Sequence, residues 1–73
     1  MKSADMVRMA NQIASFFAPY PRPEAVKGVA GHLKGYWEAR MLTMLYAHRD
    51  AGGAGLDPLV TAAIDEILRP AKA

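Results

Sequence analysis

The stretch AHRDAGGAGLDPLV, residues 47–60, decides the fold, because it ends one helix, turns the backbone and starts another. Gly52 and Gly53 follow an apolar run with helical spacing, and glycine reaches the left-handed conformation that ends helices without a Cβ clash. Asp57 can cap the next helix with its side chain, and Pro58 suits the first helical position. The stretch therefore predicts a helix, a glycine loop and a second helix.

Working outward from this loop, apolar residues with helical spacing predict helices over about residues 4–18, 24–35, 38–51 and 58–69. Ser3 is a candidate N-cap for the first helix, and the prolines at 19, 21 and 23 end it. Segments two and three form either one kinked helix or two helices. No alternating pattern indicates a strand, so we predict an all-α fold, a small single domain of three to four short amphipathic helices over residues 1–73.

Three glycines of the second segment, Gly28, Gly31 and Gly35, fall together on one side of the predicted helix. Each mid-helix glycine costs roughly 0.5–1 kcal/mol relative to alanine. Two interpretations stay open. The glycines could let another backbone approach closely, or they could mark a weakly formed helix face in solvent.

Composition favours a subunit over an independent protein. A chain of 73 residues buries only about 60% of its unfolded surface, and the absence of cysteine excludes disulfides and thiolate metal ligands. Small scaffolds without such links often rely on partners, although a marginally stable monomer is the alternative. The net charge is only +2 and the basic residues are scattered, which argues against a nucleic-acid footprint. No apolar run is long enough to span a membrane or serve as a signal peptide, so we expect a cytoplasmic protein.

The sequence contains no pattern of catalytic or metal-ligating residues. His32 and His48 are the only histidines, and neither belongs to an HExxH-type motif. The two serines, Ser3 and Ser15, have no base at nucleophile-elbow spacing. The glycine loop follows a helix and lacks both dinucleotide-binding and P-loop spacing. We therefore predict no catalytic, cofactor-binding or metal site in this chain.

Large apolar side chains are the prominent feature instead. Methionine packs adaptably at binding surfaces, and Trp, Tyr and Arg dominate interface hot spots. Short helices cannot shelter all of these groups, so we expect some to form the core and others to contact a partner, with the YWEAR stretch at 36–40 as the preferred anchor. The predicted partner interface comprises Met6, Met9, Phe16, Phe17, Tyr36, Trp37, Arg40 and Met41.

Four blocks of the sequence carry a family resemblance. They are MVRMANQIASFF at 6–17, GVAGHL at 28–33, YWEARM at 36–41 and AHRDAGGAGLDPLV at 47–60. In order and spacing they resemble the delta subunit of cytoplasmic, NAD-dependent, molybdenum-containing formate dehydrogenases. The family pattern has an aromatic-Trp-Asp-Pro-Arg-Met run, whereas Glu38 and Ala39 here replace the Asp and Pro. An Asp-Pro pair starts a helix sharply, so this departure puts the helix boundary near residue 38 in doubt.

The resemblance implies a non-catalytic accessory subunit that binds the large molybdenum-carrying alpha subunit, in a hetero-oligomer with beta and gamma subunits. It implies a role in assembly, stability or cofactor insertion. Molybdopterin, iron–sulfur clusters, FMN and NAD are then expected on the other subunits, and none on this chain. The alternatives from the residues alone are a small basic helical nucleic-acid-binding module, a self-associating module and, least supported, a small enzyme.

Overall fold

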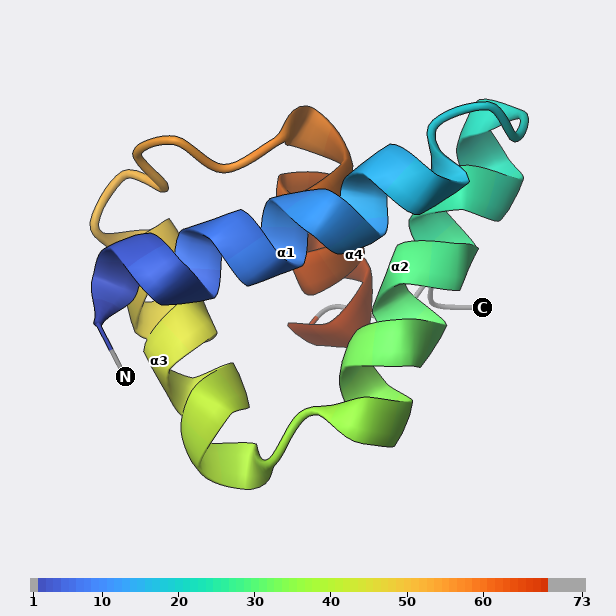
Figure 1. Cartoon of the computed structure of the whole chain (residues 1–73). Coiled ribbons are helices and arrows are strands. Elements are labelled where there is room, and N and C mark those ends of the chain that lie inside the picture. Colours follow the sequence, from blue (N-terminus) through green and yellow to red (C-terminus); the bar gives the residue numbers. More distant parts are fainter. Residues whose placement is uncertain (1, 69–73) are drawn as a thin grey trace.

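The computed structural model describes residues 2–68, which form four α-helices and no strand (Figure 1). The helices are α1 (Ser3–Phe17), α2 (Arg22–Tyr36), α3 (Ala39–Asp50) and α4 (Pro58–Leu68). The predicted all-α fold is confirmed. Residue 69, the predicted end of the fourth segment, lies outside the described residues.

Helix α1 crosses one face of the molecule, with α3 below its N-terminal end, α2 at its C-terminal end and α4 behind it (Figure 1). All four helices contribute to one core, and the largest fully buried side chains are Met6, Leu33, Leu45, Ile64, Val29 and Val60. The Cα radius of gyration is 11.3 Å. A compact domain of this length is expected to have a value of about 11 Å. The described residues therefore form a closed globule with a single core.

Segments two and three are separate helices. Trp37 (φ −87°, ψ 138°) and Glu38 (φ −68°, ψ 155°) are both extended, and this break lets α3 turn away from α2. The backbone N–H of Trp37 still donates to the Leu33 carbonyl at 3.1 Å and closes the last turn of α2. Helix α3 begins at Ala39, and the Glu38 side chain makes no capping hydrogen bond. The boundary near residue 38 is thus kept without an Asp-Pro pair.

The glycine loop has the predicted form. Gly52, Gly53 and Gly55 all have positive φ, at 119°, 65° and 81°. The Asp57 carboxylate accepts a hydrogen bond from the Leu59 backbone N–H at 2.8 Å, which confirms the predicted cap of α4. The prediction for Ser3 was wrong, because Lys2 occupies the cap position of α1 without a side-chain bond and Ser3 is already helical.

Side chains hold the loop and α4 against the other helices. The His48 ring forms a 2.8 Å hydrogen bond with the Ala54 carbonyl, so this histidine is a partly buried structural residue. Arg49 donates two hydrogen bonds to the Asp65 carboxylate, at 3.0 and 3.1 Å, and so joins α3 to α4. The bond to Asp65 raises the pKa of the Arg49 guanidinium above its ordinary value, and the charge of the carboxylate acts in the same direction.

Candidate functional site

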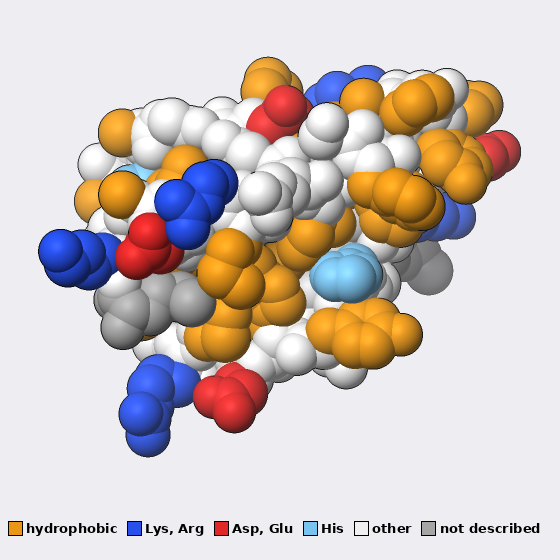
Figure 2. All heavy atoms as spheres, viewed as in Figure 1, with side chains coloured by type: hydrophobic (Ala, Val, Ile, Leu, Met, Phe, Trp, Pro, Cys, Tyr) orange, Lys and Arg blue, Asp and Glu red, His pale blue; other side chains and the backbone are white. Residues whose placement is uncertain are grey.

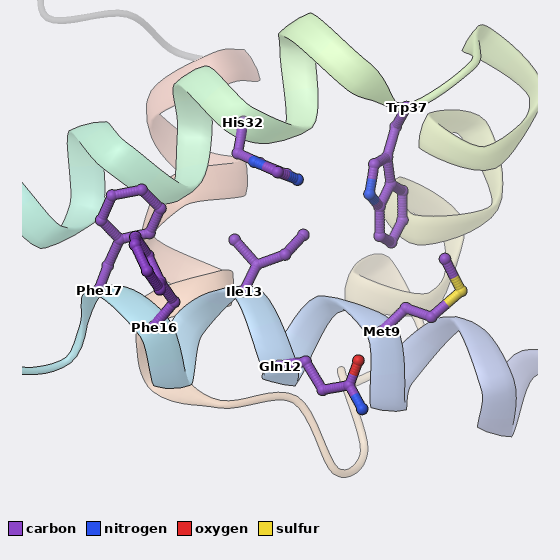
Figure 3. Close-up of a pocket in the computed structure, with 7 residues that line it drawn as sticks. All are labelled: Met9, Gln12, Ile13, Phe16, Phe17, His32 and Trp37. Atoms are coloured by element: carbon purple, nitrogen blue, oxygen red, sulfur yellow. The ribbon is translucent and has the colours of Figure 1, made fainter.

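A groove of about 530 Å³ lies between α1 and α2 (Figure 3). Phe16 and Phe17 stand at one end of it, and the Trp37 indole reaches from the end of α2 toward Met9 at the other. Ile13 from α1 and His32 from α2 project into the space between these ends. The lining residues are Met9, Gln12, Ile13, Phe16, Phe17, His32 and Trp37.

The phenylalanine end of the groove is an aromatic cluster at the end of α1. The rings of Phe16 and Phe17 meet edge to face, with centroids 5.0 Å apart and planes at 89°, and the Tyr20 ring lies 5.7 Å from Phe17. Edge-to-face contact is a favoured arrangement of aromatic pairs. Phe17 is partly buried against the core, whereas Phe16 is 68% exposed. The contact with Phe17 therefore holds Phe16 at the surface, where most of its side chain stays exposed.

The α2 wall carries a second aromatic contact. The rings of His32 and Tyr36 lie 4.7 Å apart at 35°, one helical turn from each other. Tyr36 is 78% exposed. Figure 2 shows hydrophobic side chains gathered on this face of the molecule over α1 and α2, with a histidine among them. The face thus presents aromatic rings from two helices beside one groove.

The chemistry of the groove is that of an apolar contact surface. No Asp, Glu, Lys or Arg lines it, and its polar side chains are those of Gln12 and His32. Among residues 2–68, no three His, Cys, Asp or Glu side chains are grouped as a metal site would require. Within the same range, none of the helices is long and apolar enough to cross a membrane. The lining favours recognition of apolar side chains, because these lose unfavourable contact with water when they enter it.

The groove brings together only part of the predicted interface. Met9, Phe16, Phe17 and Trp37 line it, and Tyr36 stacks on a lining residue. Arg40 is exposed on α3, outside the lining. Met41 is partly buried against the core and also lies outside the lining.

Two of the predicted interface residues are core residues. Met6 has 0% exposure, so it has no surface to offer a partner in this fold. Trp37 is only 8% exposed and forms the end wall of the groove, so it does not protrude as the expected anchor. Met6 lies on the part of the apolar face of α1 that the other helices cover, so it becomes buried. Trp37 follows the end of α2 in an extended conformation, and its indole packs inward against the core.

Sequence reasoning missed several residues of this surface. Ile13 lies on the same predicted face as Met9 and Phe16, so the periodicity already contained the signal for it. His32 had no such signal, because it reaches the groove only through the packing of α2 across α1. Tyr20 contacts Phe17 through the local turn that follows α1, where its backbone N–H donates to the Phe17 carbonyl at 3.0 Å. In the sequence, Gly28 stands out only as one of three glycines on one side of the predicted helix.

The three glycines of α2, Gly28, Gly31 and Gly35, have different surroundings in the structure. A Cβ atom at Gly31 or Gly35 would meet nothing within 4 Å, so both positions face open space in this chain. A Cβ atom at Gly28 would lie 2.5 Å from the Phe17 ring. Close approach therefore applies at Gly28 and involves a side chain of α1.

Comparison with protein families gives one match. The model of the NADH-dependent formate dehydrogenase delta subunit, FdsD, matches residues 5–64. Searches of curated proteins and of solved structures gave no match. Since the family model spans most of the 73 residues, the chain belongs to the formate dehydrogenase delta-subunit family.

Proposed function

We propose that this delta subunit is a non-catalytic accessory subunit that binds the large, molybdenum-carrying alpha subunit of its formate dehydrogenase through the groove between α1 and α2. Membership of the delta-subunit family supports a role inside a multi-subunit enzyme. The observation that supports this docking surface is a pair of large aromatic side chains, Phe16 and Tyr36, which stay 68% and 78% exposed beside a groove that no Asp, Glu, Lys or Arg lines.

Burial of apolar side chains would be more favourable on this face than on the rest of the surface. Burying a fully exposed phenylalanine side chain contributes about 1.5–3 kcal/mol, and aromatic residues are enriched among interface hot spots. Neither Phe16 nor Tyr36 is needed to complete the core, since all of the largest fully buried side chains lie elsewhere. Docking would therefore remove apolar surface from water without disturbing this fold.

The proposed role is to stabilise the alpha subunit or to favour a form of it that accepts cofactor. A bound subunit shifts its partner toward the conformation that it binds more tightly, by an amount set by the difference in affinity. In this proposal molybdopterin, iron–sulfur clusters, FMN and NAD belong to the other subunits of a cytoplasmic complex that also contains beta and gamma subunits.

The test is co-purification of this chain with a tagged alpha subunit from cells that express both. We expect Phe16→Glu to weaken the complex by about tenfold or more, because a charge would enter an apolar contact. Leu68→Glu is the matched control, since Leu68 is also an exposed apolar residue, at 48%, but does not line the groove. The two variants should keep wild-type helical spectra.

Equal recovery of both variants with the alpha subunit would contradict the proposed docking surface. Failure of the wild-type chain to co-purify would contradict the proposed partner. Sedimentation of the full chain alone distinguishes a further outcome, since a defined oligomer that Phe16→Glu dissociates would assign the groove to a second copy of the chain.

A further inference from the structure

Gly28 and Phe17 are in direct contact across the α1–α2 interface. A Cβ atom added at Gly28 would lie 2.5 Å from Cδ1 and from Cε1 of the Phe17 ring, and 2.9 Å from Cζ. Carbon atoms at optimal separation are about 3.5–4.0 Å apart, so even a single methyl group cannot share this space with the ring. The ring of Phe17 therefore occupies the space that a side chain at residue 28 would fill.

The atoms in conflict decide what would move. All three belong to the Phe17 side chain, and no backbone atom is among the nearest three. A side chain relieves such an overlap by rotating about χ1, which costs less than moving a packed helix. An alanine at residue 28 would thus displace the ring of Phe17 and leave the helices in place.

A displaced Phe17 ring would also disturb the exposed aromatic side chains that it contacts. Its ring contacts both Phe16, at a centroid distance of 5.0 Å, and Tyr20, at 5.7 Å. Phe16 and Phe17 together form one end of the groove. A Phe17 ring that is pushed away from Gly28 must move along the groove between the helices or turn toward solvent. Either movement removes its edge-to-face contact with the Phe16 ring.

We infer that Gly28 is a positioning residue for the docking surface. Because residue 28 has no side chain, the Phe17 ring can pack directly against α2, and its contact with Phe16 then fixes the orientation of the Phe16 ring. This inference rests on the proposed function for its effect on binding. It assigns to Gly28 a role that Gly31 and Gly35 do not share, since a Cβ atom at either of those positions would meet nothing within 4 Å.

The experiment compares Gly28→Ala with Gly31→Ala, two substitutions in the same helix with the same gain in helix propensity. Affinity for the alpha subunit is measured with the full chain. We expect Gly31→Ala to bind within about twofold of wild type. We expect Gly28→Ala to bind about tenfold more weakly, with an unchanged helical spectrum.

A double-mutant cycle with Phe17→Leu isolates the contact, because leucine keeps an apolar side chain but removes the ring. In that background Gly28→Ala should change the affinity by less than about twofold. Equal weakening by Gly28→Ala in both backgrounds would overturn the inference, as would wild-type affinity of the single variant. Should Gly28→Ala alone fail to fold, recovery of the helical spectrum by Phe17→Leu supports the steric contact, and failure of the double variant to recover contradicts it.

A measurement on the chain alone separates this inference from the proposed function. Nuclear Overhauser contacts between the Phe17 ring protons and the α protons of residue 28 should be strong in the wild type. They should weaken in Gly28→Ala, while the contacts between Ile13 and α2 persist. Unchanged ring contacts in Gly28→Ala would overturn the positioning role, whether or not the wild-type chain binds the alpha subunit.

Discussion

The side-chain oxygen of Asn11 accepts a 2.9 Å hydrogen bond from the backbone N–H of Asp57, a residue 46 positions further along the chain. The amide nitrogen of Asn11 also donates to the Gly55 carbonyl at 2.8 Å. One side chain of α1 thus satisfies a donor and an acceptor of the glycine loop just before α4 begins. These two hydrogen bonds hold the glycine loop against α1, the helix that forms one wall of the groove.

Asn11→Ala should lower the free energy of unfolding by about 1–2 kcal/mol, because it leaves the partly buried Asp57 N–H without its partner. The measurement is urea unfolding followed by far-UV circular dichroism. Ser15→Ala is the control, since Ser15 is exposed on the same helix. Wild-type stability of Asn11→Ala would show that water replaces the side chain at no cost.

Trp37→Ala should act first on folding. Truncation of a buried tryptophan costs about 3–5 kcal/mol, which is a large fraction of the stability of a small domain. We expect a strongly lowered melting temperature, and a smaller loss for Trp37→Phe, which keeps much of the apolar volume. If Trp37→Ala melts like the wild type but loses affinity for the alpha subunit, the indole is instead a contact anchor.

Glu38 and Ala39 offer a gain in stability. Glu38 has φ −68° and ψ 155°, a conformation that a residue before proline readily adopts, and Ala39 is the first residue of α3. Glu38→Asp combined with Ala39→Pro should therefore raise the free energy of unfolding by about 1 kcal/mol, through a capping bond and a stiffer unfolded chain. The urea midpoint measures it, with both single variants as controls. A lowered midpoint would mean that the α2–α3 connection needs a conformation that proline excludes.

The helices could be predicted from the sequence because their ends depend on local chemistry. Asp57 caps α4 and Gly52 ends α3 through interactions within a few residues. Which residues of an apolar face stay exposed is a tertiary property. Met6 and Phe16 share one face of α1, yet one is fully buried and the other is 68% exposed, because the packing helices cover only part of that face. The groove between α1 and α2 exists because α2 packs across α1, and no spacing of residues along the chain predicts that packing.

Substitutions at two neighbouring glycines of the loop should lower the free energy of unfolding by different amounts. Gly53, with φ 65°, lies in the left-handed helical region that asparagine tolerates, and a Cβ atom there would meet Leu56 at an ordinary 3.6 Å. Gly52, with φ 119°, lies outside that region, where any side chain is strained. Gly53→Asn should therefore cost less than about 1 kcal/mol, and Gly52→Asn about 1–3 kcal/mol. Urea unfolding of the two variants measures the difference, and equal costs would indicate that the loop relaxes as a unit around either residue.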